Sequence, residues 1–182
     1  EVMAPMLTAR SYVCTAVLDN KLYAAGGQGG DGVERSNSVG RYDLAANAWE
    51  AVAPMATARE QFGAAVLDGK IYVVGGLGVT TSLNSIERYD PATSAWEAVT
   101  SMTTARHDLG VAVLDGKLYA VGGLDAGLDT LSSVERYDAA TNAWEAVAPM
   151  ATTRYSHAVA VLDGRLYAVG GFNDGDGDFG TV

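Results

Sequence analysis

The chain has 182 residues, of which 48% are apolar and 19% charged, a composition that supports a packed core and argues against global disorder. Acidic residues outnumber basic ones 22 to 12, so the formal charge is −10, and no nucleic-acid partner is expected because phosphate neutralisation needs Lys and Arg. No apolar run reaches the roughly 18 residues that span a bilayer, so no membrane partner is expected either.

The dominant feature of the sequence is an internal repeat of about 48 residues. An Arg, a Gly-Gly doublet, a Tyr and a Trp recur in one register, and the doublets lie 49, 47 and 48 residues apart. The repeated arginines are Arg10, Arg59, Arg106 and Arg154, and the doublets are Gly26-Gly27, Gly75-Gly76, Gly122-Gly123 and Gly170-Gly171. We therefore interpret residues 1–182 as a single segment of nearly four units. The units span about 1–49, 50–96, 97–144 and 145–182, and the last one is incomplete.

Each unit is predicted to form four short strands, which the second unit illustrates in chain order. An apolar run at 63–67 is followed by Asp68-Gly69 and by a second apolar run at 70–74. Asp-Gly between two apolar runs is typical of a hairpin with a type I′ turn, because both central residues must adopt a positive φ. A second hairpin is predicted over 85–97, with its turn at Asp90-Pro91. No stretch has apolar residues at helical spacing over ten or more positions, so the fold class is all-β.

A four-stranded antiparallel unit repeated at this length is typical of a propeller blade. WD40 repeats are an alternative, but they are shorter, at about 40–45 residues, and carry Gly-His and Trp-Asp signatures that this chain lacks. The stretch 122–154 instead has Gly122-Gly123, Tyr137, Trp144 and Arg154 in the order of the kelch consensus. On these motifs, the chain closely resembles the kelch-repeat family over essentially all of its length.

The resemblance implies a kelch-type β-propeller of nearly four four-stranded antiparallel blades, with the first strand of each unit innermost. Such propellers usually close with about six blades, so we expect an open arc of a larger ring. The alignment of Glu1–Met6 with Glu50–Met55 agrees with this, because it starts the chain in the tail of an outermost strand. The alternative is a compact four-bladed ring in which Glu1–Met6 lies beside the last blade.

No cofactor or metal is predicted. The chain has two histidines, His107 and His157, and one cysteine, Cys14, without spacing typical of zinc or copper and with too few His for the copper site of galactose oxidase, a kelch-type enzyme. The stretch Asn173–Gly180 has Asp at alternate positions like the start of a calcium loop, but Phe179 stands where Gly is expected. A solvated acidic loop is favoured there, and calcium binding is left open. A single Cys forms no internal disulfide, and a cytoplasmic location is favoured.

The positions that vary between units are the candidates for partner binding. In kelch propellers, the residues directly after the repeated Arg and directly after the doublet lie on loops around the mouth of the central channel, at a face that commonly binds peptides. The candidate partner-binding residues are Ser11, Gln28, Glu60, Leu77, His107, Leu124, Tyr155 and Phe172. They are flanked by Gln61, Asp108, Asp125 and Asp174. Apolar tips surrounded by acid predict a protein or peptide ligand with apolar anchors and a net basic charge.

The resemblance implies a non-catalytic protein–protein interaction module, such as the substrate-recognition part of a larger adaptor, and no catalytic residue is predicted. Positions repeated in every unit, including the Arg, are expected to be structural, and the Arg is expected to form hydrogen bonds between blades. The alternative function is enzymatic, because some bacterial kelch propellers are sugar mutarotases. Glu60, Arg59 and His107 would then act at the channel mouth. The oligomeric state and any flanking domains are left open.

Overall fold

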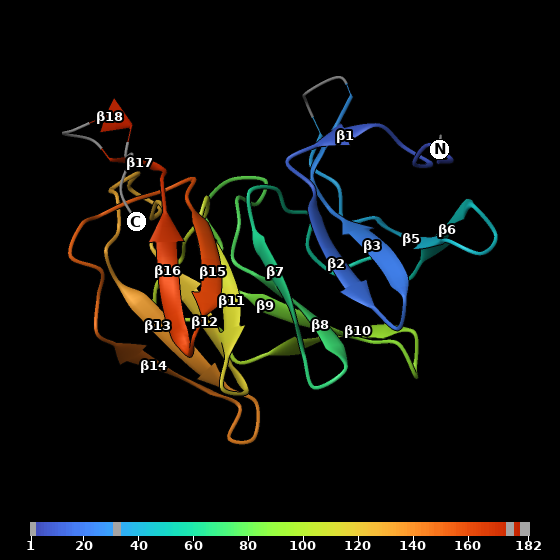
Figure 1. Cartoon of the computed structure of the whole chain (residues 1–182). Coiled ribbons are helices and arrows are strands. Elements are labelled where there is room, and N and C mark those ends of the chain that lie inside the picture. The colour runs from blue at the N-terminus through green and yellow to red at the C-terminus, as the bar shows by residue number, and fades with distance from the viewer. Residues whose placement is uncertain (1–2, 31–33, 174–176, 179–182) are drawn as a thin grey trace.

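The computed structural model describes residues 3–30, 34–173 and 177–178, and these residues form strands and turns without a helix. Three four-stranded antiparallel sheets follow one another along the chain, and a two-stranded sheet comes after them (Figure 1). Within the described ranges, no helix is therefore present that could cross a membrane. The predicted all-β class and the four-stranded blades are confirmed.

Each blade is built from strands that come from one stretch of the chain and pair in chain order. The first contains β2 (Cys14–Leu18), β3 (Lys21–Ala25), β5 (Val39–Asp43) and β6 (Ala48–Val52). The second contains β7 (Gly63–Leu67), β8 (Lys70–Val74), β9 (Ile86–Asp90) and β10 (Ala95–Val99). The third contains β11 (Gly110–Leu114), β12 (Lys117–Val121), β13 (Val134–Asp138) and β14 (Ala143–Val147). In the fourth, β15 (Ala158–Leu162) pairs with β16 (Arg165–Val169). Short strands β1 (Arg10–Ser11) and β4 (Gln28–Gly29) pair with each other, as do β17 (Phe172–Asn173) and β18 (Gly177–Asp178).

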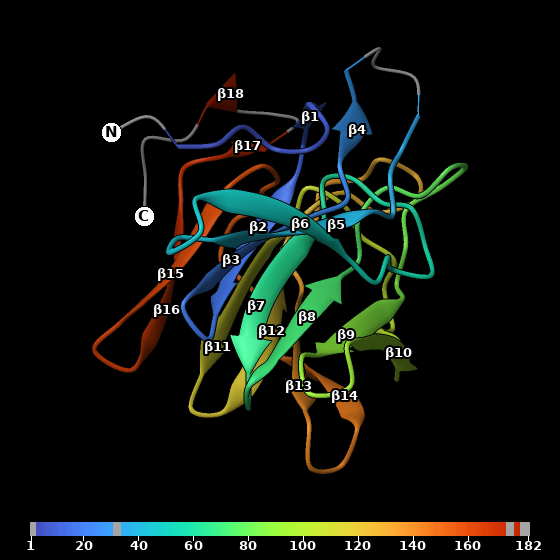
Figure 2. The same cartoon turned by 90° about the vertical axis from the view of Figure 1, so that its right-hand side faces the viewer.

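The inner hairpin of every blade turns at the pair predicted from the sequence. In the second blade, Asp68 has φ 49° and Gly69 has φ 70°, and the equivalent pairs of the other blades also have positive φ at both residues. This is the backbone of a type I′ turn, which matches the twist of the flanking strands. These turns lie at one end of the inner strands, whereas β1, β4, β17 and β18 lie at the opposite end (Figures 1 and 2).

Neighbouring blades pack face to face through equivalent positions. We call the face of a sheet that meets the following blade its forward face, and the opposite one its backward face. In the first seam, the ring of Tyr23 lies 5.7 Å from that of Tyr89, and in the second seam Tyr72 lies 5.9 Å from Tyr137. Trp96 packs against the apolar cluster of the first seam. The repeated Tyr89, Tyr137 and Trp96 therefore pack between blades.

Small residues in the inner strands allow these seams to close near the propeller axis. A Cβ atom added to Gly63 would lie 2.0 Å from Cγ2 of Val111, and one added to Gly110 would lie 2.1 Å from Cγ2 of Val159. β2 packs against β7, β7 against β11, and β11 against β15. The inner strands therefore succeed one another across the molecule, side by side in Figure 1.

The two end faces are exposed. Val17 on the backward face of the first blade is 65% exposed, and Leu162 on the forward face of the fourth is 60% exposed, whereas Leu67 is 3% exposed inside a seam. The carbonyl oxygen of Ala4 accepts a hydrogen bond from Nε1 of Trp49, so the N-terminal segment lies against the first blade and not beside the last one. The blades form an open arc, as predicted, and completion to about six blades stays a prediction.

Candidate functional site

The candidate residues pair two by two at the end of the blades opposite the Asp-Gly turns. Ser11 pairs with Gln28 in the β1–β4 ladder, and isolated bridges join Glu60 to Leu77, His107 to Leu124 and Tyr155 to Phe172. We call this set of four pairs the mouth face. The doublet that follows the second strand of each blade has positive φ at both glycines, which returns the chain to this end. The structure thus gathers the eight residues in equivalent places.

The repeated Arg supports the mouth face from inside and does not reach its surface. The Arg59 side chain is fully buried, and its guanidinium donates to the carbonyl oxygen of Ser85 at 3.1 Å and to Oε1 of Glu87 at 2.8 Å. Its backbone amide donates to the carbonyl of Ser36 at 3.2 Å, and its carbonyl accepts from the amide of Gly27 at 2.8 Å. Since Ser36 and Gly27 belong to the first blade, Arg59 connects two blades, which is the role predicted for it.

Glu60 is buried, with 4% of its surface exposed, and its charge is compensated. Nε of Arg35 donates to Oε1 of Glu60 at 2.9 Å, and the same guanidinium reaches the carbonyl of Val79 at 3.4 Å. Among the described residues, Oε2 of Glu60 has no hydrogen-bond partner. Arg35 was missed at the sequence level because it lies in a loop that carries no repeated marker.

His107 is also 4% exposed and belongs to a buried polar chain. Its Nδ1 lies 2.8 Å from Oγ of Ser82, and that hydroxyl donates to the carbonyl oxygen of Asp125 at 3.1 Å. The one hydroxyl proton of Ser82 is donated to Asp125, so in the contact between Ser82 and His107 the protonated Nδ1 of His107 donates to Oγ of Ser82. Burial lowers the pKa of His107, which keeps the imidazole neutral at pH 7. Ser82 is a second residue that the repeat pattern did not reveal.

Backbone bonds between blades close the inner rim of the mouth face. The residues two positions after the repeated Arg all have φ near +50°, namely Tyr12, Gln61, Asp108 and Ser156. The amide of Asp108 donates to the carbonyl of Gln61 at 2.8 Å, and the amide of Ser156 donates to that of Asp108 at 2.9 Å. Nε2 of Gln61 also donates to Oδ2 of Asp108 at 3.1 Å. Burial raises the pKa of Asp108, although His107 opposes the shift.

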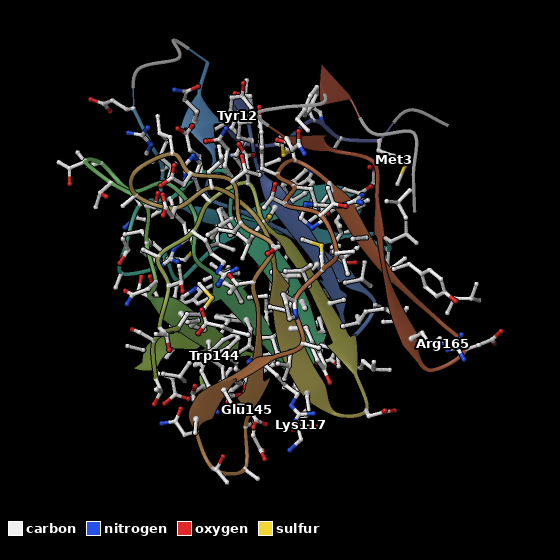
Figure 3. The ribbon with its side chains drawn as sticks, turned by 90° about the vertical axis from the view of Figure 1, so that its left-hand side faces the viewer. Met3, Tyr12, Lys117, Trp144, Glu145 and Arg165 are labelled. Carbon is white, nitrogen blue, oxygen red and sulfur yellow. The ribbon has the colours of Figure 1, made fainter. Side chains whose placement is uncertain are left out.

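Exposed apolar side chains at this end of the molecule include aromatic ones, beside Val79 and Leu128 of the loops. The rings of Tyr155 and Phe172 lie 5.6 Å apart at an interplanar angle of 32°, and Phe172 is 42% exposed. Tyr12 is 58% exposed and lies at the end opposite Lys117 (Figure 3). Ser11 is exposed, whereas Gln28, Leu77 and Leu124 are half-buried.

The acidic residues are less available than the sequence suggested. Glu60 is paired inside the protein, and one carboxylate oxygen of Asp125 accepts from the amides of Gly127 at 2.7 Å and Asp129 at 3.0 Å. Asp174 lies outside the described residues, as does most of the stretch that resembled a calcium loop. In the part of the chain that the structure describes, no three His, Cys, Asp or Glu side chains gather as a metal site would require.

Comparison with known proteins agrees with this architecture. The family model described as the KLHDC2/KLHL20/DRC7 Kelch-repeats domain matches residues 1–171. The solved structure of YjhT superposes with a TM-score of 0.82 at 18% sequence identity, over 90% of this chain and 60% of that one. At this identity the likeness concerns the fold, and the chain spans about 60% of the length of YjhT. No curated protein sequence matches significantly.

Proposed function

The chain belongs to the kelch-repeat family, and on this basis we propose that it is a non-catalytic interaction module that binds a protein or peptide segment at its mouth face. The observation that carries the proposal is the exposure of aromatic side chains on a rigid support. Tyr12 and Phe172 are exposed at the end where the β1–β4 ladder and the bridges fix the backbone. Exposed aromatic side chains on rigid scaffolds are typical anchors of protein interfaces.

The proposed ligand has apolar anchors and a net basic charge. Its anchors would pack on Tyr12, Phe172 and the half-buried leucines of the mouth face. Because Arg35 neutralises Glu60, the preference for a basic ligand would arise mainly from the net charge of −10. Such a field steers association over distances of about 8–10 Å at 0.10–0.15 M salt.

The sugar-processing alternative has less support from the geometry. A catalytic acid or base must come within hydrogen-bond reach of the substrate. Arg59 is fully buried with its terminal nitrogens on protein acceptors, and Glu60 and His107 are each 4% exposed. These three side chains therefore support the fold of the mouth face better than they would contact a sugar on it.

A selection from a library of displayed peptides tests the proposal. Tyr12→Ala combined with Phe172→Ala should weaken the selected peptides at least about tenfold, the effect of a modest hot spot. Leu44→Ser is the matched control, because Leu44 is 66% exposed in the turn between β5 and β6, away from the mouth face. Selected peptides should be net basic and should associate more slowly as salt rises.

Two results would contradict the proposal. One is a selection that returns acidic peptides, or peptides that bind the double variant as tightly as the wild type. The other is saturable binding of a monosaccharide that is lost in Glu60→Gln, which would favour the enzymatic alternative instead.

A further inference from the structure

The second blade contains a buried carboxylate site formed by two successive amides and an arginine. Glu87, in β9, is 3% exposed. Its Oε2 accepts from the amide of Ala56 at 2.6 Å, and its Oε1 accepts from the amide of Thr57 at 3.0 Å and from Nη2 of Arg59 at 2.8 Å. All three donors come from the segment that connects β6 to β7.

The third blade repeats this site with nearly the same distances. Glu135, in β13, accepts from the amides of Thr103 at 2.7 Å and Thr104 at 3.0 Å, and from Nη2 of Arg106 at 2.8 Å. The arrangement is therefore a property of the repeat. The equivalent donors can be sought in the first blade by subtracting one repeat length.

In the first blade, the donors are present and the carboxylate is missing. Gly40 holds the equivalent position in β5, between Ala24 and Ala51, as Glu87 lies between Val73 and Ala98 in the second blade. The equivalent donors are the amides of Leu7 and Thr8 and the guanidinium of Arg10. Over residues 3–30 and 34–173, neither amide donates a hydrogen bond.

Arg10 is held in the orientation that its counterparts adopt. Its Nη1 donates to the carbonyl oxygens of Gly26 and Ser38, both at 3.0 Å, and its Nη2 donates to Oγ of Ser38 at 2.7 Å. Arg59 contacts the repeat equivalents of the same three acceptors and uses the second hydrogen of Nη2 for its glutamate. In Arg10, that second hydrogen is left for another acceptor.

A cavity that is open to solvent occupies the place of the missing side chain, and Leu7 and Thr8 at its edge are exposed. Its volume is about 90 Å³, and its lining includes Leu7, Thr8, Arg10, Gly40 and Trp49. That is more than one water molecule needs. Its polar donors carry one positive charge, and no acidic side chain is among the residues that line it.

We propose that this cavity binds a small monocarboxylate anion of the size of formate or acetate. The two oxygens of the anion would take the places that Oε1 and Oε2 of Glu87 hold in the second blade, with the amides of Leu7 and Thr8 and Nη2 of Arg10 as donors. Charge-assisted hydrogen bonds from an Arg to a carboxylate are strong, and two oxygens match this fork of donors. The proposal is independent of ligand binding at the mouth face.

Titration with sodium acetate, followed by NMR of the backbone amides, tests the site directly. The amides of Leu7 and Thr8 should shift and saturate with acetate and should not do so with sodium chloride at equal pH and ionic strength. Acetate should also raise the melting temperature above its value in chloride. If these two amides respond no more to acetate than to chloride, the proposal is wrong.

Gly40→Glu is the decisive variant, because it supplies the carboxylate from the protein itself. A Cβ atom at this position lies 3.2 Å from Cε3 of Trp49, so the indole must move by a few tenths of an ångström. The variant should lose the acetate response, whereas Ala92→Glu, which adds the same charge in an exposed turn, should keep it. Arg10→Gln should weaken acetate binding at least tenfold. It replaces Gly40→Glu as the test variant if Gly40→Glu does not fold. The proposal is overturned if the amides of the folded variant respond to acetate as strongly as those of the wild type.

Discussion

Replacing Gly75 by Ala tests why glycine is needed at the doublet. Glycine is needed either because another segment approaches closely or only because the backbone has a positive φ. Gly75 has φ +62°, and a Cβ atom there would lie 2.5 Å from the carbonyl oxygen of Arg106. That oxygen accepts the amide of Gly76 at 2.8 Å, so it has little freedom to move. Gly69 is the matched control, because it has φ +70° but nothing within 4 Å of its Cβ position.

The two variants should differ by the overpacking alone. Each places Ala in the left-handed region, which costs about 1–2 kcal/mol, and each restricts the unfolded chain to the same extent. Overpacking adds about 1–3 kcal/mol for Gly75→Ala only. For a domain of this size, 1 kcal/mol changes the melting temperature by about 2–4 °C, so Gly75→Ala should melt roughly 2–12 °C below Gly69→Ala.

Urea unfolding followed by circular dichroism, together with thermal melts, measures this difference. Gly69→Ala should be less stable than the wild type, because its Ala adopts a positive φ without any overpacking. The comparison is valid only if this loss is observed. Equal free energies of unfolding for the two variants would refute the argument that the doublet is needed where Arg106 approaches.

Three further predictions concern the seams. Trp96→Ala should lower the free energy of unfolding, measured in urea, by about 2–4 kcal/mol, which is less than the usual 3–5 kcal/mol because the indole is only half-buried. Trp96→Phe, which keeps an aromatic ring against Tyr89, should lower it less. Glu135→Gly should cost about 3–5 kcal/mol, because the buried guanidinium of Arg106 loses its carboxylate partner. Acetate but not chloride should restore part of the melting temperature. Burial lowers the pKa of His157 from 6.5 to about 4, and within the described residues neither ring nitrogen has a hydrogen-bond partner. In the unfolded state His157 binds a proton below about pH 6.5, whereas in the folded state it does so only at about pH 4. The free energy of unfolding should therefore fall by about 2 kcal/mol from pH 7 to pH 5. The fall should be smaller in His157→Gln.

Local backbone rules were enough to predict the blades. Asp68-Gly69 favours one turn type on its own, and Gly75-Gly76 favours a conformation that few other residues adopt. Because these choices depend on neighbours in the chain, they are visible without the fold. The gathering of the eight candidate residues at one end of the blades followed from the same register, since equivalent positions of a repeat reach equivalent places.

The interior of the mouth face was not predictable, because its contacts come from loops outside the register. Glu60 resembled a surface acid until Arg35 was placed beside it, and His107 is buried against Ser82. Gly40 is visible in the alignment as a substitution for Glu87. Its consequence appears only when the amides that bind Glu87 are known, and a backbone donor leaves no trace in the residue types.

The forward and backward faces of the blades have a consequence for how such a chain changes over generations. Each blade contributes one face of each kind, so duplication or deletion of a whole unit leaves every remaining seam with the same two partners. Loss of half a unit would instead leave a face such as that of Leu162 without its complement. Recombination is thus tolerated in steps of one unit. Of the residues after the Arg and the doublet, Glu60 and His107 contact the preceding blade through Arg35 and Ser82, whereas exposed ones such as Ser11 and Phe172 can change without altering a seam.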